Sequence, residues 1–92
     1  MSIVILEFAK SFAAGRLSAV VFSEAYIELW KIERDKGLLL ADSPALNECL
    51  SSIFCAADMY CRDDELREEY EFNDEQLRSE VCRLLRVIGP IS

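Results

Sequence analysis

The residues of this chain that could carry chemistry are carboxylates, and most of them lie in one acidic stretch from Asp58 to Glu75. This stretch contains two arginines and nine acidic residues, which are Asp58, Asp63, Asp64, Glu65, Glu68, Glu69, Glu71, Asp74 and Glu75. Its net charge is −7, which equals the formal charge of all 92 residues. The rest of the chain is therefore electrically balanced, and the excess negative charge is confined to one segment.

The usual patterns of catalytic and metal sites are absent from the sequence. There is no histidine, so the commonest general base is missing, and no triad or histidine-containing zinc site can form. The run Asp63–Glu65 lacks the central glycine and spaced ligands of a calcium loop, and the three glycines are isolated from one another. We therefore expect no enzymatic activity, no catalytic residue, no metal and no cofactor.

The four cysteines form no redox or metal motif either. Cys49, Cys55 and Cys61 are six residues apart, so on a helix their thiols would point about 120° away from one another. We interpret these three and Cys82 as buried, small apolar side chains in a reducing compartment.

The N-terminal MSIVILEF reaches Glu7 too early for a signal peptide, and no apolar run approaches the ~20 residues of a membrane span. Together these features predict a soluble, cytoplasmic protein.

Hydrophobic periodicity predicts four helices, which must position the acidic stretch. We expect them from Ile3 to about Ala14, from Ser18 to about Asp35, from Ser43 to near Tyr60 or Cys61, and from Asn73 to Gly89. No segment alternates with the period of a strand, and 92 residues are enough for only one core. The sequence therefore predicts an all-α, antiparallel four-helix bundle forming one domain over residues 1–92, with the acidic stretch between the third and fourth helices.

The periodicity also predicts which helix faces are buried. In the second helix, the apolar stripe of Val21, Ala25, Leu29 and Ile32 should face the core. A neighbouring aromatic stripe of Phe22, Tyr26 and Trp30 should widen this buried face. In the fourth helix, Arg78, Arg83 and Arg86 lie off the apolar stripe, so we expect them to point outward.

The acidic stretch favours recognition of a basic partner. Like charges would repel nucleic acid and anionic lipid, whereas carboxylates on a scaffold steer association with a basic groove and can stand in for phosphates. Tyr60, Tyr70 and Phe72 are interleaved with the charges, and such aromatics often anchor interfaces. Tyr60 and Phe72 could instead form the last layer of the core, an interpretation that fits Phe72 better. Tyr70 could also imitate a stacked base. The alternative interpretation is a solvated loop that keeps the protein soluble.

Five segments resemble the immunity proteins of the colicin D type, in the family of bacterial self-protective colicin-like immunity proteins. In chain order they are LEFAKSF, FSEAY, DSPALNECL, FCAAD and EYEFNDEQLRSEV, and the resemblance extends from about Leu6 to Leu85. It implies a small helical bundle, monomeric when free, that binds the C-terminal nuclease domain of a cognate bacteriocin or contact-dependent inhibition toxin in a 1:1 complex. In the colicin D case this domain is a ribonuclease that cuts transfer RNA. The acidic side chains would cover its basic RNA-binding cleft.

The resemblance also implies which residues bind the toxin. Asp58 after the two alanines and Glu71 in YEF match acidic positions of the family, whereas the other carboxylates match only as acidic residues of the same connection. The implied toxin-binding set is Asp58, Tyr60, Asp63, Asp64, Glu65, Glu68, Glu69, Tyr70 and Glu71. The segment CRDDELREE departs from the family pattern, so specificity for one toxin is expected there.

Two other classes of function remain open from the residues themselves. One is a nucleic-acid-mimicking module that inhibits another basic protein. The other is a structural bundle that dimerises through Trp30 and Leu38–Leu40.

Overall fold

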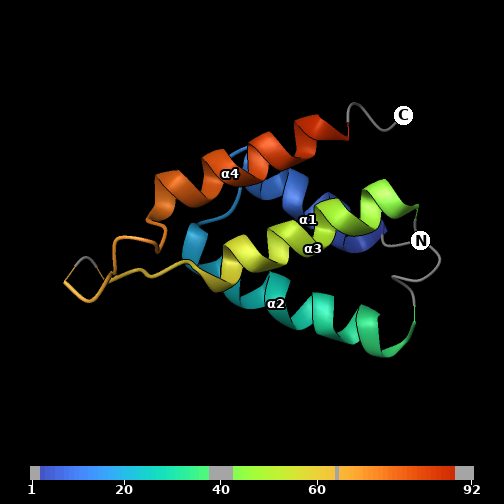
Figure 1. Cartoon of the computed structure of the whole chain (residues 1–92), viewed down its shortest axis with the longest axis horizontal. Coiled ribbons are helices and arrows are strands. Elements are labelled where there is room, and N and C mark those ends of the chain that lie inside the picture. The colour runs from blue at the N-terminus through green and yellow to red at the C-terminus, as the bar shows by residue number, and fades with distance from the viewer. Residues whose placement is uncertain (1–2, 38–42, 64, 89–92) are drawn as a thin grey trace.

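Four helices connected by short segments make up most of the chain. The computed structural model describes residues 3–37, 43–63 and 65–88. The helices are α1 (Ile3–Ala13), α2 (Ala19–Asp35), α3 (Pro44–Asp58) and α4 (Asp74–Val87). Consecutive helices run in opposite directions (Figure 1), and contacts of α1 with α2, α2 with α3, α3 with α4 and α4 with α1 close the bundle. The predicted all-α, antiparallel four-helix bundle is confirmed.

Capping residues set the helix ends close to where the sequence predicts them. The side chains of Ser18 and Ser43 each accept a hydrogen bond of 3.2 Å from a backbone N–H in the first turn of the helix that follows. Asn73 and Gln76 form a reciprocal capping box at the start of α4, with bonds of 2.8 and 2.9 Å. The third helix ends at Asp58, two or three residues before the expected end near Tyr60 or Cys61. The segment 38–42 and the stop at Gly89–Pro90 lie outside the described residues.

Aromatic rings from α1 and α2 fill the centre of the bundle. The ring of Phe22 stacks on Phe12 at a centroid distance of 4.1 Å and on Phe8 at 5.6 Å. The buried hydroxyl of Tyr26 donates a 2.7 Å hydrogen bond to the carbonyl of Leu50, which joins α2 to α3. These rings contact a single core to which all four helices contribute, and its other large, fully buried side chains are Ile5, Leu50, Ile53, Leu77 and Val81.

The prediction for the buried face of α2 was partly wrong. Val21 is 51% exposed and Ile32 is 49% exposed, whereas Phe22 and Tyr26 are fully buried. Adjacent residues of a helix differ by about 100° in direction, so the two predicted stripes compete for the same core. The aromatic stripe faces inward because its larger rings fill the space between α1 and α3.

Two further expectations are corrected by the structure. Arg78 does not point outward: its guanidinium reaches across to α1 and donates hydrogen bonds to the carbonyls of Phe12 and Leu17 at 3.1 and 2.7 Å. Arg83 and Arg86 are exposed, as predicted. Of the cysteines, only Cys49 is buried; Cys55 is exposed because it lies on the outer face of α3, and Cys61 and Cys82 are half-buried.

Candidate functional site

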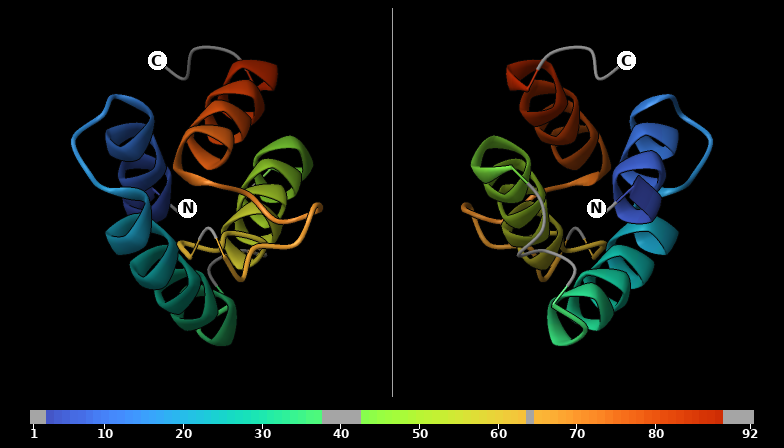
Figure 2. Two further views of the ribbon diagram at one scale, coloured as in Figure 1. Left: turned by 90° about the vertical axis from the view of Figure 1, so that its left-hand side faces the viewer. Right: turned by 90° about the vertical axis from the view of Figure 1, so that its right-hand side faces the viewer.

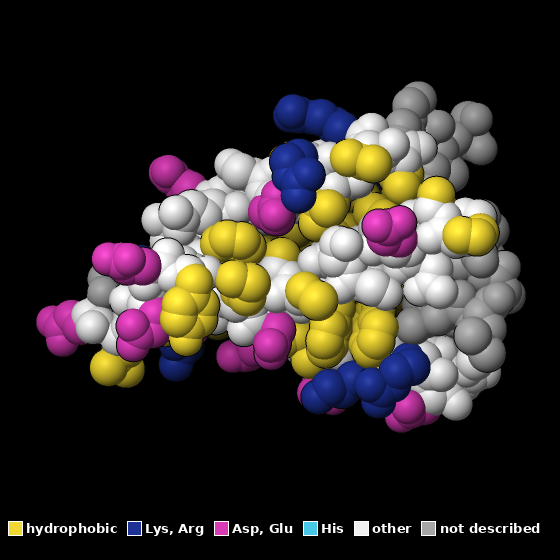
Figure 3. All heavy atoms as spheres, viewed as in Figure 1, with side chains coloured by type: hydrophobic (Ala, Val, Ile, Leu, Met, Phe, Trp, Pro, Cys, Tyr) yellow, Lys and Arg dark blue, Asp and Glu magenta, His cyan; other side chains and the backbone are white. Residues whose placement is uncertain are grey.

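The acidic stretch forms a loop at one end of the bundle. We call residues 59–73, which connect α3 to α4, the acidic loop. It projects along the long axis of the molecule, away from the helix ends at the other side (Figure 1), and Figure 2 shows the bundle from this end. Acidic side chains gather on the same end of the surface (Figure 3). The helices thus present the excess negative charge at one extremity.

The base of the acidic loop is fixed by hydrogen bonds between its two ends. The N–H of Phe72 donates to the carbonyl of Met59 at 2.9 Å, and the N–H of Cys61 donates to the carbonyl of Phe72 at 3.0 Å. These bonds form an isolated parallel bridge between Tyr60 and Phe72, and both of these side chains pack against the hydrophobic core. The expectation that Phe72 belongs to the last core layer is confirmed.

The hydroxyl of Tyr60 adds a side-chain bond at the same place. It donates to Oδ1 of Asp74, in the first turn of α4, at 2.6 Å. Burial, followed by this hydrogen bond, raises the pKa of Tyr60 to about 12. Tyr60 is therefore a neutral phenol that holds the loop to α4.

Two of the predicted site residues shape the outer part of the loop. Oδ1 of Asp63 accepts a 2.9 Å hydrogen bond from the N–H of Glu65, and its carbonyl accepts the N–H of Arg67 at 2.9 Å. A carboxylate oxygen of Glu71 accepts the N–H of Glu68, also at 2.9 Å. The side chain of Arg67 donates to the carbonyl of Cys61 at 2.9 Å and so ties the middle of the loop to its start. Hydrogen bonds therefore give the loop a defined shape.

Most of the remaining predicted residues face solvent. Asp58, Glu65, Glu68 and Glu69 are exposed, and Tyr70 is 68% exposed. Glu71 is half-buried, and Asp64 lies outside the described residues. The structure therefore brings the predicted site residues to one end of the bundle but divides them between outward-facing and loop-shaping roles.

Leu66 is a residue of this surface that the sequence analysis did not single out. Its side chain is 71% exposed in the middle of the acidic loop. Its sequence context could have indicated this exposure, because Leu66 is the one leucine within a run of charged residues and does not continue the apolar stripe of either neighbouring helix.

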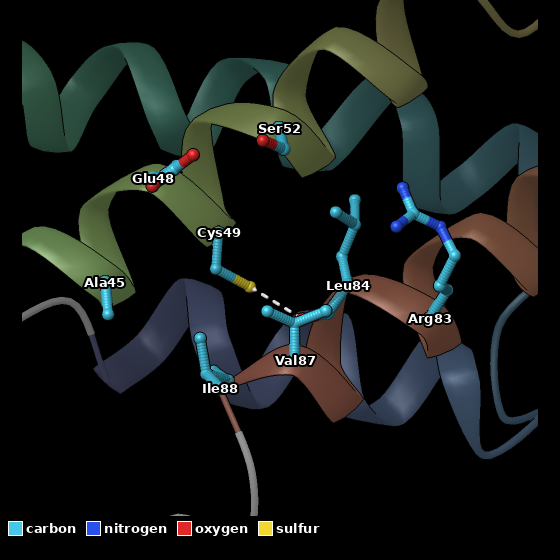
Figure 4. A pocket seen from close by; sticks show the side chains of 8 residues that line it. All are labelled: Ala45, Glu48, Cys49, Ser52, Arg83, Leu84, Val87 and Ile88. Carbon is cyan, nitrogen blue, oxygen red and sulfur yellow. Dashed lines mark hydrogen bonds between the residues drawn. The ribbon is translucent and has the colours of Figure 1, made fainter.

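The hollows in the described surface do not have the features of a catalytic or metal site. One of about 390 Å³ lies between α2 and α3 beside the acidic loop and includes Glu24, Asp58 and Tyr60 in its lining. Another of about 370 Å³ lies between α3 and α4 (Figure 4), where the Cys49 thiol points toward Leu84 and donates to its carbonyl at 3.5 Å. Burial raises the pKa of Cys49, which makes this thiol a poor nucleophile. Among residues 3–37, 43–63 and 65–88, no group of three potential ligands is placed to hold a metal ion.

Comparison with known families decides what kind of protein this is. The sequence model of the family described as bacterial self-protective colicin-like immunity matches residues 1–88. The chain belongs to this family. It is therefore a bacteriocin immunity protein, whose partner is a cognate toxin, and proteins of this family are generally not enzymes. A comparison of the immunity protein with curated proteins gives no match. None of its described helices is long and apolar enough to cross a membrane.

Proposed function

We propose that this immunity protein inactivates its toxin by covering the basic RNA-binding cleft of the toxin's C-terminal nuclease domain with the acidic loop. The nuclease cleaves transfer RNA, the complex is 1:1, and the free immunity protein is a cytoplasmic monomer. Apart from family membership, one observation carries the proposal. The entire excess charge of the protein lies in the stretch from Asp58 to Glu75, which comprises the projecting, hydrogen-bonded acidic loop and the helix ends that adjoin it.

The chemistry of the two surfaces is complementary. A cleft that binds transfer RNA must present lysine and arginine side chains to phosphates, and the same cations pair with carboxylates. The acidic loop therefore acts as a mimic of the RNA backbone. Because hydrogen bonds already define its shape, little conformational entropy is lost on binding.

The structure suggests how the work is divided among the implied residues. Glu65, Glu68 and Glu69 are exposed and are the carboxylates best placed to pair with the toxin. Asp63 and Glu71 accept backbone hydrogen bonds inside the loop, so they hold its shape as well as adding charge. Asp58, Tyr60 and Tyr70 complete the proposed surface, and Asp64, which lies outside the described residues, is included from the sequence alone.

The test replaces only the outward carboxylates. A Glu65→Gln, Glu68→Gln, Glu69→Gln variant removes three charges with little change of shape and leaves the bonds of Asp63 and Glu71 in place. The matched control is Glu7→Gln, Glu28→Gln, Asp35→Asn, which removes three exposed charges from α1 and α2. Both variants have the same net charge, so any difference between them reports local contact rather than overall electrostatics.

Binding is measured by titration calorimetry with the C-terminal domain of the cognate toxin. We expect the loop variant to bind at least about tenfold more weakly, which corresponds to ~1.4 kcal/mol, and the control to bind within about threefold of the wild type. Equal affinity of the two variants would reject the acidic loop as the interface. The alternative interpretation, in which the charge only keeps the protein soluble, would then be favoured.

A further inference from the structure

Two large apolar side chains stand out from the acidic loop. Leu66 and Tyr70 are 71% and 68% exposed, although they lie among carboxylates in the most highly charged segment of the chain. Figure 3 shows hydrophobic surface among the acidic side chains at this end of the molecule. Single exposed leucines are common on proteins, so exposure alone does not imply a function.

Hydrogen-bonded turns shape the backbone that carries both side chains. The N–H of Leu66 donates to the carbonyl of Asp63 at 3.2 Å, and the N–H of Glu71 donates to the carbonyl of Glu68 at 3.0 Å, which closes the turn containing Tyr70. Neither side chain is among those that pack against the hydrophobic core. Ordered turns of the loop therefore present two apolar side chains that add little to the stability of the free protein.

We infer that Leu66 and Tyr70 are the apolar anchors of the interface, each buried against hydrophobic surface bordered by basic side chains in the toxin's cleft; together we call these two side chains the anchor. This inference rests on the proposed function. The surrounding carboxylates would form a polar rim that pairs with the cations, while the anchor is buried from water in the centre of the contact. In many protein–protein interfaces, a few buried residues supply most of the binding energy and a rim of weak contacts surrounds them. Tyrosine is common among these buried residues.

The two kinds of side chain would then control different rates. Charges act over about 8 Å at physiological salt, so the carboxylates accelerate the encounter of the two proteins. Apolar burial acts only after contact, so Leu66 and Tyr70 slow dissociation.

The test measures association and dissociation rates with the same C-terminal toxin domain at several salt concentrations. For Leu66→Ala and for Tyr70→Ala, we expect dissociation to be faster by on the order of tenfold, with association within about twofold of the wild type. Tyr70→Phe, which keeps the ring, should dissociate within about threefold of the wild-type rate. Val87→Ala removes an equally exposed side chain at the far end of α4 and is the matched control. Denaturation curves should show that all four variants are as stable as the wild type.

The outcomes separate this inference from the proposed function. Wild-type dissociation of Leu66→Ala and Tyr70→Ala, together with slow association of the Glu65, Glu68, Glu69 variant, would overturn the anchor and leave the acidic loop as the interface. Wild-type rates for all of these variants would overturn both. Fast dissociation of the anchor variants with no effect of the carboxylates would support the anchor and reject phosphate mimicry.

Discussion

Arg78 offers the sharpest test of how the bundle is held together. Its guanidinium donates hydrogen bonds to the carbonyls of Phe12 and Leu17 at 3.1 and 2.7 Å, and lies 4.6 Å from the centre of the Phe12 ring. These contacts attach α4 to the end of α1 and to the connection that leads into α2. Arg78→Met keeps most of the side-chain length and apolar contact but removes the charge and all donors.

The size of the effect follows from these contacts. A hydrogen bond from a charged group is worth about 1.5–3 kcal/mol, and a cation–π contact about 0.5–1 kcal/mol at a solvated site. The carbonyl of Phe12 keeps a second partner, the N–H of Gly15 at 2.9 Å, so the loss falls mainly on the carbonyl of Leu17. Because Arg78 is half-buried, we expect Arg78→Met to lower the free energy of unfolding by about 2–4 kcal/mol.

Urea denaturation followed by circular dichroism measures this change. A loss of 1 kcal/mol lowers Tm by roughly 4–8 °C in a domain of this size. Arg86→Met is the control, because Arg86 is exposed in the last turn of the same helix, and its effect should stay within about 0.5 kcal/mol. If the two variants are equally stable, the contacts of Arg78 do not hold α4 in place and the reasoning is refuted.

Two further predictions concern titration and reactivity. The pKa of Tyr60, raised to about 12, lies above the ordinary value near 10, so the folded protein binds the phenolic proton more tightly than the unfolded chain does. The contribution of Tyr60 to stability should therefore be complete below about pH 10 and be lost as the pH rises to about 12. In denaturation curves, the free energy of unfolding of Tyr60→Phe should fall less over this range than that of the wild type. If both proteins lose the same free energy of unfolding over this range, the result would count against the bond between Tyr60 and Asp74. Cys55 is exposed whereas Cys49 is buried with a raised pKa, so iodoacetamide labelling read by mass spectrometry should modify Cys55 at least about tenfold faster. Equal labelling rates would show that α3 opens readily in solution.

The helix boundaries could be predicted from the sequence because local residues determine them. Ser18, Ser43 and Asn73 bond to backbone groups three residues away, and Gly15 ends the first helical segment with a φ of 84°. None of these interactions depends on the rest of the fold. The four-helix architecture follows from the same signals together with the apolar stripes.

The corrected features depend on contacts between helices. Whether Val21 or Phe22 faces inward is decided by the rings of α1, which the pattern within α2 does not contain. Arg78 binds carbonyls that lie more than 60 residues earlier in the chain. Because Arg78 lies on the polar side of the α4 pattern, the sequence predicted that its side chain points outward, which is wrong.

The candidate site shows the same division. The sequence located the charge and its place between the third and fourth helices. The bridge between Tyr60 and Phe72 and the bonds of Asp63 and Glu71 arise only when α3 and α4 bring the two ends of the loop together. For this reason the sequence could not separate the carboxylates that shape the loop, Asp63 and Glu71, from those that face outward, whereas the structure does.

Competition with RNA tests the central claim most directly. Labelled transfer RNA is bound to a catalytically inactive variant of the C-terminal toxin domain, and the immunity protein is added while fluorescence anisotropy reports the bound RNA. We predict that the immunity protein releases the RNA completely, with one molecule displacing the RNA from one toxin domain. A ternary complex in which the RNA stays bound would contradict occlusion of the RNA-binding cleft by the acidic loop.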